Sequence, residues 1–79
     1  MNERIKLIWD FYGPNAKPTA THHVKHLDEY AVSENLQNTL SGAEKVTPNH
    51  HIAYMVVEKN MMDSLRQTLK PTRGQLYQE

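Results

Sequence analysis

The sequence predicts an α+β domain in which a small antiparallel sheet carries two helices on one face. Three observations favour this fold class. Two segments have the alternating side chains of strands, two others place apolar residues at helical spacing, and the segments follow the order β-α-β-β-α. We expect one domain over residues 1–79, near the lower end of independently stable sizes. Without cysteine, so small a core is expected to need association or a ligand for stability.

The first strand is expected over residues 5–12, where Ile5, Leu7, Trp9 and Phe11 alternate onto one face. The turn residues 13–15 end it. A helix should follow, with Asn15 or Lys17 as its cap and Pro18 in its first turn. Its apolar stripe is Ala20, Val24, Leu27 and Ala31.

Residues 36–46 predict a weaker strand, because they are polar and include Gly42, which is typical of a bulged edge strand. Residues 47–49 form a turn signal, so the next strand, 50–58, completes a hairpin. This is the strongest strand in the chain. Ile52, Tyr54 and Val56 lie on one side of it, and Ala53, Met55 and Val57 lie on the other.

Asn60 and Asp63 resemble a capping box that opens a second helix. This helix runs through Met61, Met62, Leu65 and Leu69, and Pro71 ends it. For residues 73–77 two interpretations remain open: a short last strand, or an arm that docks elsewhere.

This order predicts a ferredoxin-like plait, β-α-β-β-α with an optional final β, in which the first and third strands are central. Those two strands are also the ones with apolar residues on both faces. Since two helices cover one face only, we expect a contiguous apolar patch on the other. A second copy is the commonest cover, which predicts a homodimer through this face. The alternative is that the C-terminal tail lies across it.

The element order, the length, and the Trp9-Asp10-Phe11 strand leading into a His-bearing helix resemble the dimeric α+β barrel group. That group includes muconolactone isomerase, cofactor-independent monooxygenases, stress-responsive barrel proteins and small nickel-binding proteins. The resemblance implies two plaits packed sheet to sheet around a shared cavity. It covers nearly the whole chain, and it implies a fold and a dimer but no functional residue.

The charge pattern and the hydropathy of the chain limit the classes of partner that we expect. Nine basic and nine acidic side chains are scattered along the chain, so no basic stripe predicts a nucleic-acid partner. The longest apolar run, residues 53–57, is too short to span a membrane. With no leader-like segment at the start, we expect a cytoplasmic protein.

Candidate site residues gather at one end of the expected sheet: Asp10, Tyr12, His22, His23, His50, His51 and Glu44. His23, on the apolar flank of its helix, is either a core residue or a general base. Burial of Asp10 would raise its pKa and suit an acid or base, unless it bonds to the turn from Gly13 onward. Tyr12 could orient a ligand through its hydroxyl.

A metal site is a further hypothesis. His22 and His26 are four residues apart on a helix, so both imidazoles could reach one ion. His50 or His51 would complete a set suited to zinc, nickel or copper. Alternatively, His22 and His26 are solvated and His50 and His51 flank a turn.

Residues 70–74 could hold an anionic ligand, or could simply be a capped helix end with basic residues. Taken together, the sequence predicts a small-ligand-binding homodimeric α+β barrel protein. The alternatives are a cofactor-free isomerase or oxygenase using His23 with Asp10 or Tyr12, a zinc- or nickel-binding protein, and a pure interaction module.

Overall fold

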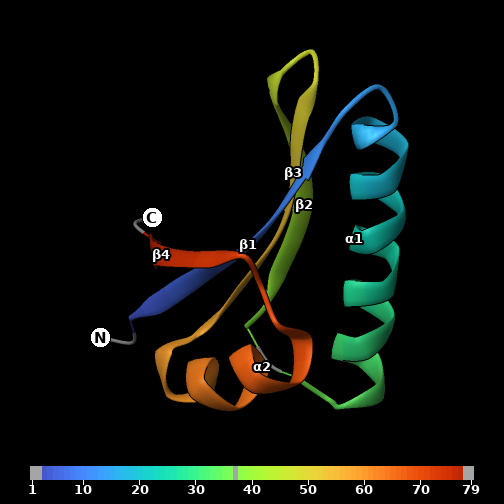
Figure 1. The fold of residues 1–79 in the computed structure, drawn as a ribbon. Helices are drawn as coiled ribbons and strands as arrows, with labels where there is room; N and C mark the ends of the chain where they lie inside the picture. Colours follow the sequence, from blue (N-terminus) through green and yellow to red (C-terminus); the bar gives the residue numbers. More distant parts are fainter. Residues whose placement is uncertain (1–2, 37, 78–79) are drawn as a thin grey trace.

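The computed structural model describes residues 3–36 and 38–77, and this part of the chain has the order β-α-β-β-α-β of a ferredoxin-like plait (Figure 1). The elements are β1 (Arg4–Tyr12), α1 (Ala16–Ser33), β2 (Leu40–Thr47), β3 (His50–Glu58), a 3-10 turn η1 (Lys59–Met61), α2 (Met62–Leu69) and β4 (Arg73–Tyr77). The sheet is antiparallel, with strand order β2-β3-β1-β4. The expected central strands β1 and β3 and the expected edge strand β2 are confirmed.

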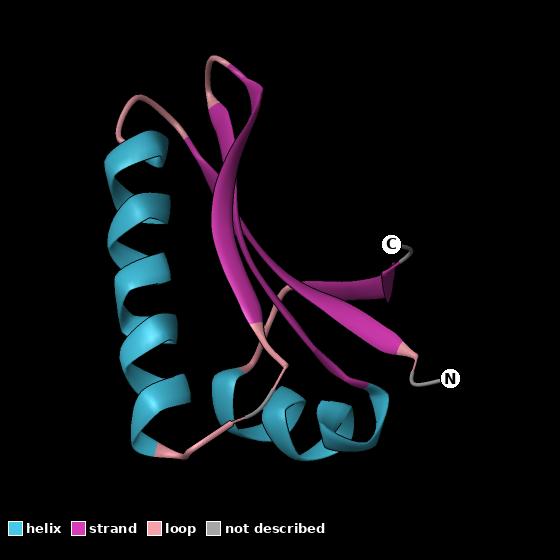
Figure 2. Ribbon diagram, turned by 180° about the vertical axis from the view of Figure 1, so that it is seen from behind, coloured by secondary structure: helices cyan, strands magenta, loops and turns pink. Residues whose placement is uncertain are grey.

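The C-terminal tail is a strand. It pairs with β1 so that Tyr77 lies opposite Arg4 and Arg73 lies opposite Ile8. The tail therefore extends the sheet and does not lie across it (Figure 2). Of the two interpretations of residues 73–77, the strand is correct.

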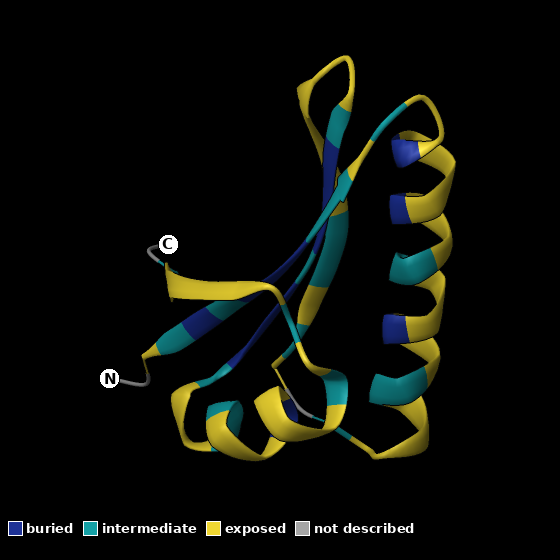
Figure 3. Cartoon of the chain, in the orientation of Figure 1, coloured by how far each residue is buried: buried dark blue, intermediate teal, exposed yellow. Residues whose placement is uncertain are grey.

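The core lies between α1 and the face of the sheet that carries the odd-numbered residues of β1. Its cluster draws on both helices and both central strands; its buried members are Ile5, Leu7, Trp9, Ala20, Leu27, Ala53, Met55, Val57 and Leu65. Figure 3 shows the buried positions of α1 turned toward the sheet. Burial of such side chains stabilises the fold by about 1.5–3 kcal/mol each.

The other face, which we call the open face, carries the even-numbered residues of β1 and β3. Figures 1 and 2 show no helix on it within the part of the chain that they draw. Yet Ile8, Ile52 and Val56 on this face are only 2%, 5% and 0% exposed. The expectation of a contiguous exposed apolar patch is therefore wrong.

Longer side chains of the same face lie over these short aliphatic ones. The Tyr54 ring covers Gly42, where an added Cβ would come within 2.5 Å of its Oη. The Lys6 ammonium sits 4.4 Å from the centre of that ring and 3.4 Å from Glu44. Tyrosine and lysine can bury their apolar parts while their polar ends stay in water, so the open face is amphipathic.

Two local expectations need correction. β2 begins at Leu40, four residues later than expected, although the expected bulge is present between Lys45 and Thr47. The capping box is not formed, because α2 starts after the 3-10 turn with Met61 as its N-cap and no side-chain cap bond. Asn15 is the N-cap of α1, which confirms one of the two expected caps, although its side chain accepts no cap bond. No helix in the described ranges is both long and apolar enough to cross a membrane.

Candidate functional site

Four polar side chains meet on the open face where β1 ends, β3 begins and β4 begins. We call this set, Asp10, Tyr12, His50 and Arg73, the Asp10 cluster. Antiparallel pairing produces it, because Tyr12 lies directly opposite His50 and Arg73 directly opposite Ile8. Alternation then points all four side chains to one face.

The Asp10 carboxylate is the centre of the cluster. Its Oδ1 accepts a bond from His50 Nε2 at 2.7 Å, and its two oxygens accept from Arg73 Nη2 at 3.2 Å and Nε at 3.0 Å. The Asp10 backbone N–H donates to Thr72 Oγ1 at 3.2 Å. With 6% of its side chain exposed, Asp10 is nearly closed off from water. A carboxylate so placed is held in one orientation by two donors.

The Arg73 guanidinium holds the pKa of the Asp10 carboxyl below its usual value. Desolvation acts in the opposite direction, and His50 adds a second lowering effect. The sequence-based expectation of a raised pKa, or of bonds to the turn at Gly13, is therefore wrong, because both alternatives left out a cation 63 residues away. In return, the Asp10 carboxylate raises the pKa of Arg73.

His50 has one ring nitrogen bound and one available. Since the carboxylate can only accept, Nε2 carries the hydrogen, which leaves a lone pair on Nδ1 of the neutral ring. Among the described residues, Nδ1 has no hydrogen-bond partner. The Tyr12 ring stacks on the imidazole at a centroid distance of 4.3 Å and an interplanar angle of 17°. Tyr12 is 72% exposed and the Arg73 side chain is 48% exposed, so the cluster faces solvent mainly through these two residues, while the His50 side chain is 18% exposed.

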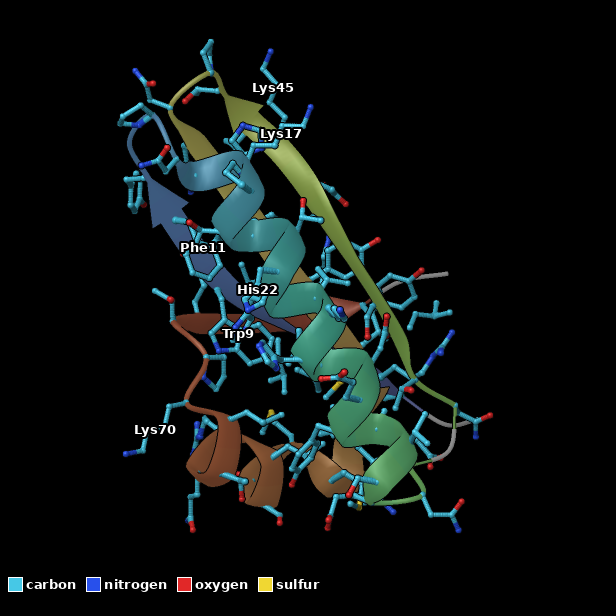
Figure 4. All side chains as sticks on the ribbon, turned by 90° about the vertical axis from the view of Figure 1, so that its right-hand side faces the viewer. Trp9, Phe11, Lys17, His22, Lys45 and Lys70 are labelled. Carbon is cyan, nitrogen blue, oxygen red and sulfur yellow. The ribbon has the colours of Figure 1, made fainter. Side chains whose placement is uncertain are left out.

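His23 lies on the opposite side of β1 from Asp10. Its ring contacts those of Trp9 and Phe11, with centroids 4.9 and 5.6 Å away, and Figure 4 shows both aromatic side chains beside α1. Its Nε2 is buried without a hydrogen-bond partner in the described structure. Burial lowers the pKa of His23, and the neighbouring His26 and His22 lower it further. The structure thus does not bring His23 to Asp10 or Tyr12.

The histidines considered as metal ligands do not all come together. His22 and His26 meet on the exposed side of α1, with their Nε2 atoms 2.9 Å apart and His26 Nδ1 3.4 Å from Glu29. His50 belongs to the Asp10 cluster, and His51 is 8% exposed on the helix side of β3. Within residues 3–36 and 38–77, no three His, Asp or Glu side chains are placed to hold one metal ion. The zinc or nickel hypothesis stays a prediction from sequence.

Sequence reasoning placed Asp10, Tyr12 and His50 at one end of the sheet, and they do meet there, but it missed Arg73 and Thr72 as their partners. One signal was available. Residues 70–74 already stood out as basic, and a strand interpretation of the tail would have placed Arg73 beside β1. Glu44, expected at the same end, instead pairs with Lys6.

Comparison with known proteins adds no relative. No family model matches the chain, and neither the search of curated proteins nor that of solved structures finds a match.

Proposed function

We propose that this chain binds a small polar organic molecule at the Asp10 cluster and that it works as a homodimer whose two open faces meet. One observation supports the ligand site: a nearly buried carboxylate fixes both Arg73 and His50, and an exposed Tyr12 stacks on the His50 ring. Small-molecule sites orient their ligands with a few fixed polar groups beside aromatic surface. The cluster offers both.

The polar atoms of the cluster that have no partner indicate which functional groups such a molecule would have. Asp10 neutralises the charge of Arg73, while the Tyr12 hydroxyl and the His50 Nδ1 remain without partners among the described residues. A hydroxyl can donate and accept, and the His50 lone pair can accept. A planar molecule with a carbonyl and a hydroxyl or N–H group matches them, with its ring or double bond against Tyr12.

The composition of the open face supports the homodimer. Tyr12, Tyr54 and Tyr77 all lie on it, and each contacts a basic side chain: His50, Lys6 and Arg4 respectively. Tyrosine and arginine are enriched where protein interfaces form, because they bury apolar area and still satisfy their polar ends. In this proposal both helices stay on the outer faces, and the ligand sites lie at the two ends of the interface.

A titration followed by amide NMR spectra tests the ligand site. With a panel of small lactones, amides and phenols, at least one compound should shift the amide signals of Tyr12, His50 and Arg73 in a saturable way. His50→Gln should weaken that compound at least about tenfold, since a lost bond to a positioned group is worth 1–2 kcal/mol. His26→Gln, the same exchange on the exposed side of α1, should leave its affinity unchanged. A panel that leaves those three signals unmoved, or equal binding by His50→Gln, would refute the site.

A second candidate function is a cofactor-free isomerase or oxygenase, favoured by the 2.7 Å bond between Asp10 and His50. A histidine oriented by a carboxylate can remove a proton with its other nitrogen, so His50 takes the place that the sequence assigned to His23. The same titration separates the two candidates. An enzyme converts the bound compound and produces new signals from it, whereas a binding protein only shifts and releases it.

A further inference from the structure

A groove of about 400 Å³ lies on the helix side of the sheet, between α2 and the pair β1–β4. Figures 1 and 2 show the loop after α2 leading directly into β4, so helix and strand flank the same space. The apolar side chains that line it are Ile5, Leu7, Met62, Pro71 and Leu76. This volume falls within the range of about 300–1,000 Å³ that is usual for small-molecule sites.

The groove exists because two residues of β4, Gly74 and Leu76, leave this space unfilled. Gly74 lies opposite Leu7, and an added Cβ would stand 3.7 Å from the side chains of Ile5 and Leu7, an ordinary contact. Neither its backbone conformation nor a close neighbour therefore requires glycine. Leu76 also points to the helix side, yet it is 53% exposed. The short helix α2 fully buries Leu65 and does not reach across β4.

The charged residues that line the groove are basic, although Asp63 stands beside one of them. Its lining includes Arg66 and Arg73 and no acidic residue. A smaller groove of about 210 Å³ beside α2 has the opposite character, since its lining includes Glu34 and Glu58 and no Lys or Arg.

Arg66 is the cation that a ligand can reach. Arg73 is held by Asp10 on the open face, whereas among the described residues Arg66 forms an ion pair only with the exposed Asp63, at 3.6 Å. Exposed pairs of this kind contribute little, so a competing carboxylate can replace Asp63.

We propose that this groove binds an amphiphile with a medium-length aliphatic chain and a carboxylate head. The chain lies over Gly74 between Met62 and Leu76, and the carboxylate lies at Arg66. The site is separate from the Asp10 cluster, and it does not depend on the function proposed above.

Octanoate and octylammonium, which share a chain and differ in the sign of the head group, are the probes. Octanoate should shift the amide signals of Thr72, Gly74 and Leu76 saturably, with a Kd at or below about 1 mM, as expected for a ligand of this size. Octylammonium should bind at least about threefold more weakly, because exposed charges contribute little more than that. Arg66→Gln should remove the difference between the two probes.

Gly74→Leu tests the location. The new side chain fills the groove floor and should weaken octanoate at least tenfold, while Gln67→Leu on the exposed side of α2 should bind like the natural chain. Should Gly74→Leu fail to fold, Leu76→Gln replaces it and should weaken octanoate at least about threefold by removing an apolar wall. Unmoved groove signals, equal binding of the two probes, or full affinity in the groove variants would overturn the proposal.

Discussion

At the scale of single residues, the two faces of β1 place the polar groups of Asp10 and His23 in opposite electrostatic environments. Asp10 finds a cation and a histidine on the open face, and its charged form is stabilised. His23 faces the helix side of the same strand, where its neighbours are the rings of Trp9 and Phe11 and its charged form is disfavoured. Neither environment follows from the residue type, because each depends on contacts made across the fold.

His23 should make the protein less stable in mild acid. Its pKa in the folded chain lies below the usual 6.5, so the unfolded chain binds the proton more readily. The stability associated with neutral His23 is complete above about pH 6.5 and is lost as the pH falls below that value. His23→Phe should flatten this dependence, because a ring without a titrating group takes its place.

Urea unfolding at pH 7.5 and at pH 5.5 measures this effect. The free energy of unfolding should fall between these values by less in His23→Phe than in the natural chain. An identical fall in both proteins would contradict the assignment to His23. Asp10 does not interfere, since its carboxyl titrates below 3.8.

At the scale of elements, both helices end in a residue with left-handed backbone. Asn35 follows α1 with a φ of 54°, and Leu36 N–H donates back to the Ala31 carbonyl at 2.9 Å. Lys70 ends α2 with a φ of 51°, and its N–H donates to the Arg66 carbonyl at 3.0 Å. Asparagine tolerates this region, but lysine does so at a cost. The end of α2 is therefore the more strained of the two.

Lys70→Gly should stabilise the protein by about 0.5–1 kcal/mol. Glycine removes the cost of the left-handed conformation, about 1–2 kcal/mol, and part of this gain is offset by the greater freedom of the unfolded chain. Lys70→Ala keeps the Cβ and serves as the matched control. Thermal unfolding of the three proteins gives the answer, and a melting temperature that rises equally in both variants would point to charge and not to backbone strain.

At the scale of elements, local sequence patterns predict some bounds of strands and helices correctly and others wrongly. The bounds of β3 were predicted at both ends, because alternation is strict from His50 to Glu58 and a turn signal precedes it. β2 was predicted too long, since residues 37–39 are polar, and both loops and edge strands have such residues. The capping box failed because Asn60 falls inside a 3-10 turn, which a spacing of three residues cannot reveal.

At the scale of the whole molecule, the proposed homodimer rests on the open face and its three tyrosines. Light scattering should give a molar mass of about twice the 9.2 kDa of a single chain. Gln75→Glu adds a charge to each copy on the open face next to Tyr77, and like charges brought together should weaken association at least about tenfold. Gln67→Glu, the same exchange on the exposed side of α2, should leave the mass unchanged. A mass of one chain at all concentrations would refute the homodimer.

By itself, the sequence determined the order of the strands and helices, the two central strands and the residues that face the core. These features follow from periods of about two and 3.6 residues, which can be read within one segment. Only the tertiary structure decided the partners of Asp10 and the burial of Ile8, Ile52 and Val56 on the open face. The physical reason is sequence distance. Arg73 and His50 reach Asp10 only through strand register, and the cover over the aliphatic residues comes from side chains on neighbouring strands.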